Sequence, residues 1–277
     1  MKKLTWLPLA VVLLFYLLSC KRGINKEEKE TKKITAEQKE YSIERLFVTE
    51  EGCSVDTLEN CTHILLEYPV FESEKMTKAN SFLNHRMADV LGFGDAESNT
   101  LVDLEVAAQH ILNDYKEFKK EFPESPQVWN VRMISHVIYE NDDVICLKMV
   151  SESYMGGAHG SLNTMYMTFD NKTGTYVNLF DRVKNKELFI SPAEQKFCKK
   201  RNLAPGEDLE KAGFGFPDNE FALPANIGID DNGYLLHYNP YEVAPYSMGP
   251  TYLFISFDEL KKKSSSYLFR PVESADC

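Results

Sequence analysis

Apolar and polar positions along the chain form two kinds of pattern, which predict strands and helices in separate groups. Alternation with a period of two predicts strands, and turn-forming runs such as Asn171-Lys172-Thr173-Gly174 and Asp231-Asn232-Gly233 follow or separate them. The expected strands span residues 41–48, 63–71, 128–139, 144–154, 162–169, 176–180, 221–223, 227–229, 234–238 and 252–256. Apolar residues at three- and four-residue spacing predict helices over 76–90 and 101–118, and a third helical region spans 192–202.

The order of these elements predicts the fold class. The first two helices each have one apolar and one charged face, so we expect both to lie on a sheet. Pro69 lacks an N–H, and we expect the strand that contains it to lie at a sheet edge or to carry a bulge. Strands grouped with helices, without strict alternation, indicate an α+β fold with mainly antiparallel sheets and helices packed on one face.

The N-terminal residues predict where the protein resides. Lys2 and Lys3 precede an apolar run that ends in Leu17-Leu18-Ser19-Cys20, which is typical of a lipoprotein signal peptide over residues 1–19. Cys20 would then carry the lipid, and the charged residues 20–40 would form a solvated tether. An uncleaved anchor helix is the alternative, although the run is short of the roughly 20 residues that span a bilayer. We therefore expect a lipid-anchored protein of the cell envelope, facing the periplasm or the surface.

Composition and net charge limit the classes of binding partner that the protein is expected to have. The chain has 277 residues, 43% of them hydrophobic and 12% aromatic, so the part from residue 41 onward can build a substantial core. Its net charge is −11, and removal of residues 1–19, with two lysines and no acidic residue, makes it −13. Such a charge disfavours nucleic acid and anionic lipid as partners and steers basic proteins towards the surface. Acidic proteins without any particular partner are also common.

The six cysteines divide into several environments. Cys53 and Cys61 lie eight residues apart around turn-forming residues, which predicts a disulfide that an exported protein allows. Cys146 lies in an apolar strand and is expected to be a buried thiol, while Cys198 and Cys277 have no evident partner. The chain contains no C-x-x-C motif, so neither a zinc knuckle nor a thioredoxin-like centre is predicted.

A glycine-rich segment directly after an expected strand is the first candidate for chemistry. It contains Tyr154, Gly156, Gly157 and His159, and its glycines permit positive φ or a close approach of the backbone to another group. The P-loop lysine and the G-x-G-x-x-G pattern are missing, so a phosphate-binding loop is not indicated. A lone histidine most often has a structural role, and no H-x-x-x-H or H-E-x-x-H pair occurs. No metal site and no cofactor are therefore predicted.

The second candidate segment is a tyrosine- and proline-rich loop over residues 239–249. Tyr241, Pro245 and Tyr246 make it rigid and aromatic, and tyrosine offers a large contact area at low entropic cost. This composition favours a recognition surface. A packed loop that closes the core is an equally good interpretation of the sequence.

Taken together, several motifs resemble a known pairing of exported domains. They are YMGGAHGS, TFDNKTG, FALPANIGI, YEVAPYSMG and FDEL, which begin at residues 154, 168, 221, 241 and 257. In order and spacing they resemble the extracellular region of the RsiV family of lysozyme-sensing anti-sigma factors. Residues 41–160 resemble the module that precedes the catalytic domain in the PdaC family of peptidoglycan deacetylases. The resemblance implies two consecutive modules, 41–160 and 161–262, before a tail over 263–277, and implies an α+β fold that binds lysozyme directly.

The departures from these families limit what the resemblance implies. The deacetylases use an aspartate in a T-F-D-D motif with a metal-binding histidine pair, whereas Asp170 here leads into Asn171-Lys172-Thr173-Gly174. We therefore expect a strand ending in a turn, and no catalytic residue is predicted. Sigma-factor control does not carry over either, because the N-terminus contains only the lipoprotein motif and a tether.

The sequence thus predicts a binding lipoprotein of the cell envelope, with a lysozyme-like protein or a peptidoglycan fragment as partner. One alternative is an enzyme or accessory subunit acting on cell-wall glycan, with His159 working beside Glu152 or Asp170. The other alternative is a structural envelope protein without a small ligand.

Overall fold

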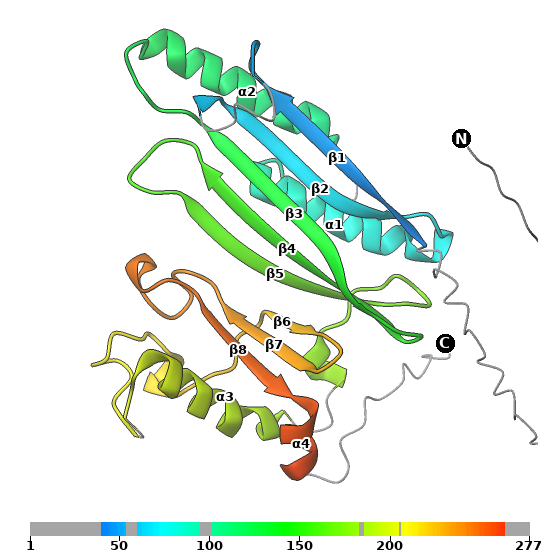
Figure 1. The fold of residues 1–277 in the computed structure, drawn as a ribbon, viewed down its shortest axis with the longest axis vertical. Helices are drawn as coiled ribbons and strands as arrows, with labels where there is room; N and C mark the ends of the chain where they lie inside the picture. The colour runs from blue at the N-terminus through cyan, green and yellow to red at the C-terminus, as the bar shows by residue number, and fades with distance from the viewer. Residues whose placement is uncertain (1–39, 54–59, 95–100, 183–185, 205, 264–277) are drawn as a thin grey trace, which may run out of the picture. The chain divides into compact units, whose positions relative to one another are not determined.

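The computed structural model describes residues 40–53, 60–94, 101–182, 186–204 and 206–263. The predicted signal peptide, Cys20 and most of the tether lie outside this part of the chain, as do Cys277 and nearly all of the predicted tail. Within the described residues, no helix is both long enough and apolar enough to cross a membrane. The fold is a mixture of helices and two separate sheets, which confirms the predicted α+β class (Figure 1).

The first sheet has five strands in the order β1-β2-β3-β4-β5. These strands are β1 (Tyr41–Thr49), β2 (His63–Phe71), β3 (Asn130–Glu140), β4 (Val144–Tyr154) and β5 (Ser161–Asp170). Neighbouring strands are antiparallel except for β2 and β3, which run parallel. The parallel pair needs a long crossover, and helices α1 (Thr77–Leu91) and α2 (Leu104–Glu121) supply it on one face of the sheet (Figure 1).

The first core lies between these helices and the sheet. Its fully buried side chains come from alternate strand positions and from helix positions three or four apart; they include Ile64, Leu66, Leu83, Met87, Ala108, Met133, Leu147 and Phe169. Asp103 begins α2, because its carboxylate accepts hydrogen bonds from the N–H groups of Glu105 and Val106. Leu101, expected on the apolar face of this helix, is 57% exposed and precedes it.

Pro69 corrects one expectation about β2. This strand is not at the edge of the sheet, because β1 and β3 pair with its two sides. Pairing with β3 stops at Glu67, however, and the backbone N–H of Glu72 bonds to the β1 side. Alternation along the strand therefore directs the Pro69 nitrogen towards the β3 side, beyond the last paired residue. A missing N–H costs nothing there.

The second sheet has three antiparallel strands, β6 (Ile227–Ile229), β7 (Gly233–Tyr238) and β8 (Thr251–Ser256). Helices α3 (Glu187–Arg201) and α4 (Phe257–Lys263) pack near β8. The core here is strongly aromatic: the ring of Phe197 contacts those of Phe214, Phe216, Phe221 and Tyr238 at centroid distances between 5.0 and 5.6 Å. The contacts of Phe197 with Phe214, Phe216 and Tyr238 are edge-to-face, and such contacts add to the stabilisation that burial provides.

Three predicted elements differ in the structure. Residues 176–180 form no strand: Tyr176 makes one isolated bridge to Phe169, and a 3-10 turn over Leu179–Arg182 follows. Residues 221–223 are not a strand either, because Phe221 packs into the aromatic core. Helix α3 begins at Glu187, ahead of the expected start at residue 192, because packing of the buried Pro192 and its neighbours outweighs the lost N–H.

Two asparagine side chains join the second sheet to the free edge of β5. Asn226 accepts a hydrogen bond from the Tyr166 N–H (2.8 Å) and donates to the Thr164 carbonyl (2.6 Å). Asn239 accepts from the Thr164 N–H (2.8 Å) and donates to the same carbonyl (3.0 Å). We call these four hydrogen bonds the asparagine clamp. Gly228 of β6 also lies close to β5, because an added Cβ would be 2.6 Å from the Tyr166 ring.

The module boundary drawn between residues 160 and 161 falls between β4 and β5, two strands of one sheet. The described residues of both modules belong to one compact unit. The module limits themselves remain a prediction.

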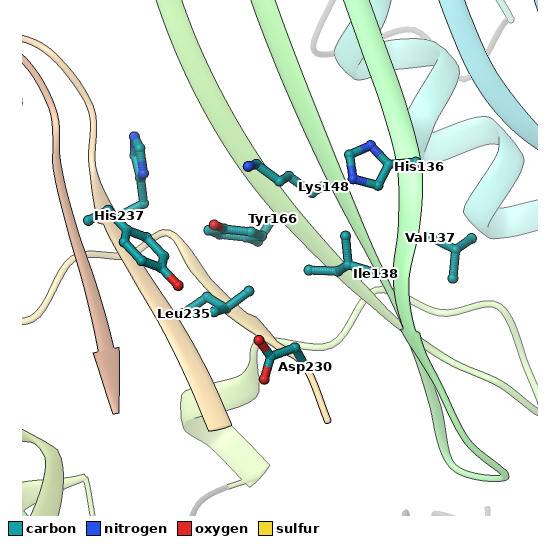
Figure 2. A pocket seen from close by; sticks show the side chains of 9 residues that line it. His136, Val137, Ile138, Lys148, Tyr166, Asp230, Leu235 and His237 are labelled. Atoms are coloured by element: carbon teal, nitrogen blue, oxygen red, sulfur yellow. The ribbon is translucent and has the colours of Figure 1, made fainter. Parts of the chain in front are cut away.

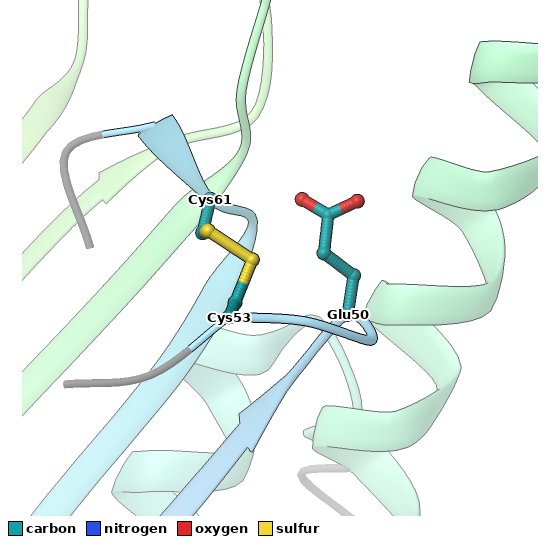
Figure 3. Close-up of side chains that lie close together, drawn as sticks. All are labelled: Glu50, Cys53 and Cys61. Carbon is teal, nitrogen blue, oxygen red and sulfur yellow. A yellow bond between two sulfur atoms is a disulfide. The ribbon is translucent and has the colours of Figure 1, made fainter. Parts of the chain in front are cut away.

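The predicted cysteine pair is a disulfide in the structure. Cys53 and Cys61 are bonded with a Cα–Cα distance of 6.0 Å, in the connection between β1 and β2 (Figure 3). The Glu50 carboxylate lies beside them and accepts a hydrogen bond from the Thr62 N–H at 2.7 Å. These three side chains are near enough to share an ion, but both sulfur atoms are engaged in the disulfide. Cys146 is buried, as expected.

We expect Asn226→Ala to destabilise the protein by about 2 kcal/mol, because it removes two hydrogen bonds and leaves the Tyr166 N–H of β5 without its partner, while the Thr164 carbonyl keeps its bond from Asn239. Urea denaturation measures this change in the free energy of unfolding. Asn113→Ala, on the exposed face of α2, is the matched control and should change it by less than about 0.5 kcal/mol. Equal effects of the two variants would contradict a special role of the clamp.

Candidate functional site

The two candidate segments, far apart in sequence, meet in the structure. The segment between β4 and β5 places the His159 ring on the Tyr246 ring, with centroids 4.1 Å apart and an interplanar angle of 15°. The Nε2 atom of His159 is 3.1 Å from the Tyr241 hydroxyl, and the rings of Tyr241 and Tyr246 are 5.6 Å apart. We call these three residues the aromatic triplet.

Hydrogen bonds fix the orientation of the histidine. Its Nδ1 lies 2.9 Å from the carbonyl oxygen of Gly160. Because a carbonyl oxygen can only accept, Nδ1 carries a hydrogen and donates the hydrogen bond. In the neutral ring Nε2 is then an acceptor, and the Tyr241 hydroxyl donates to it. Both ring nitrogens have hydrogen-bond partners within the site, which fixes the imidazole ring against Tyr246.

Glycine conformations shape the first segment. Gly156 and Gly157 have φ of +87° and +99°, in the region that favours glycine. Positive φ was one of the two roles that the sequence predicted for these glycines. The Tyr154 hydroxyl donates to the Gly157 carbonyl at 3.2 Å and closes the loop upon itself. A Cβ on Gly156 would lie 3.1 Å from Oε1 of Gln127, so the backbone also makes a close approach there.

The second segment is held by its own backbone. Tyr241 adopts φ of +68°, and its N–H donates to the Ala244 carbonyl at 3.1 Å. The Glu242 carboxylate accepts from the Asn239 N–H at 2.9 Å. Pro245 has an extended backbone and precedes the 3-10 turn Tyr246–Met248; it positions Tyr246.

Arg201 supports the same segment from the end of α3, and the sequence analysis did not identify it. Its guanidinium donates to the carbonyls of Met248 (2.8 Å) and Gly249 (2.9 Å) and to the Thr251 hydroxyl. Asn239 is the first residue of the candidate loop, two residues before Tyr241, but its hydrogen bonds to Thr164 were not predicted. A polar residue outside any periodic pattern gives no sequence signal for such a role.

The site presents apolar surface to solvent. Tyr241 is 65% exposed, and each segment adds an exposed methionine, Met155 at 42% and Met248 at 38%. A contiguous exposed apolar patch is typical of interaction surfaces, whereas single exposed apolar side chains are common on any protein. Val243 and Ala244 of the second loop pack against the second core, so this loop contributes to the core and also exposes Tyr241 and Met248.

The candidate acid–base groups are not assembled around His159. Asp170 lies at the opposite end of β5, about 30 Å away for a strand of this length. There it accepts hydrogen bonds from Lys172 N and Thr173 N, in the predicted turn after the strand. Glu152 forms an ion pair with Arg132 across the sheet at 3.5 Å.

A groove between the two sheets is a further feature that the sequence analysis missed (Figure 2). Its volume is about 570 Å³, and its lining residues are His136, Val137, Ile138, Lys148, Tyr166, Asp230, Leu235, His237 and Tyr252. These side chains come from both sheets. Polar members such as His136 and Lys148 occupy strand positions where solvent-facing residues also occur, so the sequence pattern does not reveal the groove.

The fold and the paired loops define a two-sheet α+β protein with an exposed aromatic loop site. Residues 55–162 match the family described as "Deacetylase PdaC", and residues 178–258 match "Protein of unknown function (DUF3298)". The chain therefore contains a PdaC-like N-terminal module followed by a DUF3298 domain. No curated protein matches the chain.

Solved structures show the same fold. A DUF3298 family member from Bacteroides fragilis NCTC 9343 aligns with a TM-score of 0.58 and 19% identity, over 83% of this chain and 94% of that chain. A DUF3298 family protein from Pseudomonas aeruginosa PAO1 aligns with a TM-score of 0.52 and 18% identity, over 80% and 93% of the two chains. At these identities the likeness establishes the fold alone.

We expect His237 to make stability depend on pH. Burial lowers its pKa to about 4, and the Lys148 and Lys200 ammonium groups act in the same direction. The unfolded chain, with a histidine pKa near about 6.5, binds a proton first, so stability present above that pH is lost as the pH falls towards about 4. His136, also with a lowered pKa, adds to this loss. Asp230 and the protonated Tyr166 and Tyr252 face the same groove.

Thermal melts at pH 7 and pH 5 test this expectation. The His237→Gln variant should lose less stability over this interval than the unmodified protein. His136→Gln should likewise lose less stability than the unmodified protein, because the pKa of His136 is also lowered by burial and by Lys148. An unchanged pH dependence in His237→Gln would show that this imidazole is not responsible.

Proposed function

We propose that the protein is a lipid-anchored recognition protein of the cell envelope that binds a basic, lysozyme-like protein through the aromatic triplet. The observation that carries the proposal is the stacking of His159 on Tyr246 beside the exposed Tyr241. Aromatic side chains with few rotatable bonds, presented on loops, provide contact area at low entropic cost.

The charge of the chain supports a basic partner. Its net charge is −11, and the segments 154–160 and 239–249 contain Glu242 and no lysine or arginine. A negative surface accelerates the encounter with a positively charged protein and disfavours nucleic acid. The same charge disfavours an anionic ligand at these loops.

The rigidity of the loops also supports recognition. The Arg201 guanidinium holds the carbonyls of Met248 and Gly249, and Asn239 is fixed to Thr164 of β5. A surface that is ordered before binding loses less conformational entropy when its partner arrives. The contact residues are therefore preorganised on a supported backbone.

The domain content points to the same biological setting. A PdaC-like module followed by a DUF3298 domain suggests a role related to the cell wall. A lipoprotein anchor at Cys20 would keep the domains at the envelope, where a lysozyme-like protein acts. An enzymatic role has less support, because Asp170 lies at the far end of β5 from His159.

Titration of the full-length chain with hen egg-white lysozyme tests the proposal. The double variant Tyr241→Ala/Tyr246→Ala should weaken binding at least about tenfold, because both rings would lie in the contact. Raising the salt concentration should weaken binding of the unmodified protein as well, since the attraction is partly electrostatic. Isothermal titration calorimetry measures both effects.

Tyr176→Ala is the matched control, because this exposed tyrosine follows the opposite end of β5. It should leave the affinity unchanged, provided circular dichroism shows that both variants remain folded. Absence of binding by the unmodified protein at micromolar concentrations would refute a lysozyme-like partner. Equal affinity of the double variant and the unmodified protein would exclude the aromatic triplet as the contact.

A further inference from the structure

The groove between the sheets has the chemistry of a small-molecule site. Its volume of about 570 Å³ lies within the range of known ligand pockets, which is about 300–1,000 Å³. One wall is the face of β3, β4 and β5 opposite the helices, and the other comes from β7 and β8. Figure 2 shows Lys148 extending into the space between His136 and His237.

Lys148 is the centre of positive charge in this groove. Its ammonium has no hydrogen-bond or ion-pair partner among the residues that the structure describes, although acidic side chains outnumber basic ones in the chain. The pKa values of His136 and His237 are lowered, first by burial and then by Lys148, so both rings are neutral at neutral pH. Lys148 therefore offers an unpaired cation flanked by two imidazoles that can donate or accept hydrogen bonds.

Asp230 is the carboxylate at the other end of the groove (Figure 2). One of its oxygens accepts from the N–H groups of Asn232 and Gly233, in the turn between β6 and β7. The second oxygen is available to accept from a hydroxyl group. An anionic group placed at Lys148 thus has hydrogen-bond acceptors and donors within the same cavity.

Aromatic rings complete the lining. Tyr166 is buried with its ring against Gly228, and Tyr252 is 39% exposed. Lys200 holds Tyr252 in place, because its ammonium donates to the Tyr252 carbonyl at 2.8 Å and lies 5.4 Å from the ring centroid. Fixed rings beside polar groups suit a ligand that has both flat apolar faces and hydroxyl groups.

We propose that the groove binds a sugar acid, with the ligand carboxylate at Lys148 and the sugar ring against Tyr252. The carboxylate matches the unpaired cation, and the ring hydroxyls match the imidazoles and Asp230. This site is distinct from the aromatic triplet, whose loops carry no cation, and it does not depend on the function proposed for them.

Calorimetric titrations of the full-length chain with N-acetylmuramic acid, N-acetylglucosamine and glucuronate test the proposal. N-acetylmuramic acid should bind at least about tenfold more tightly than N-acetylglucosamine, which lacks the carboxylate. Comparable binding of glucuronate would identify sugar acids in general, and weaker binding would narrow the class to those of the cell wall. Saturating acetate that competes as well as either acid would overturn the saccharide assignment and leave only an anion site.

Variants assign the binding to the groove. Lys148→Met should weaken binding of the acid at least about tenfold, whereas Lys120→Met, the same change on exposed α2, should leave it unaltered. His237→Gln provides a second readout if Lys148→Met fails to fold, and it should also weaken binding. Unaltered binding in both groove variants, or no binding at millimolar ligand, would overturn the proposal. Tyr241→Ala should have no effect, which separates this test from that of the loops.

Discussion

The free edge of β5 is the constraint on which the arrangement of this protein depends. An edge strand exposes backbone N–H and C=O groups, and proteins must cover or disfavour such an edge. Here the second sheet does not continue the first one. Two asparagine amides, from Asn226 and Asn239, bond to the edge at Thr164 and Tyr166, and the Val177 N–H bonds to the Thr168 carbonyl at 2.7 Å. The edge is thereby closed by side chains and by one short extended segment.

Closure by side chains has a geometric consequence for the candidate site. A side-chain amide fixes a single point on the edge, whereas a further strand would impose its register along the whole length of β5. Asn239 directly follows the end of β7 and bonds to Thr164, three residues after the start of β5. The loop that follows β7 and the loop that precedes β5 therefore meet. The contact of His159 with Tyr241 and Tyr246 follows from that meeting. The same clamp brings β6 against Tyr166, where glycine at position 228 is required by the close approach.

Local patterns predicted much of the fold, because the periodicity of burial is a local property. The ranges 63–71 and 144–154 match β2 and β4 to the residue. The pattern gave a wrong prediction for residues 221–223, because Phe221 packs beside Phe197 in the core although it lies in neither a strand nor a helix. Residue types at the candidate loops were informative on their own, since glycine and tyrosine-proline runs are unusual. Their meeting across 82 residues was not predictable, because it depends on amide contacts at a strand edge that carry no periodic signal.

The two candidate sites differ in charge because different residues line them. The aromatic triplet lies on loops beyond the strand ends. Glu242 is the only acidic or basic residue within segments 154–160 and 239–249, and Arg201 of α3 contacts the second segment through its backbone carbonyls. The groove lies between the strands themselves, where Lys148 projects from the sheet face towards His237, two residues before Asn239. Two stretches of backbone connect the sites. One runs from His237 to Tyr241, and the other runs along β4 and β5, which carry Lys148 and Tyr166 in the groove and lead into the segment of His159. The first stretch is held by Asn239 at one point and by the Glu242 carboxylate on the Asn239 N–H at another. Coupling through it requires the clamp to have a second stable arrangement, because the amide of Asn239 is bonded to both the N–H and the carbonyl of Thr164.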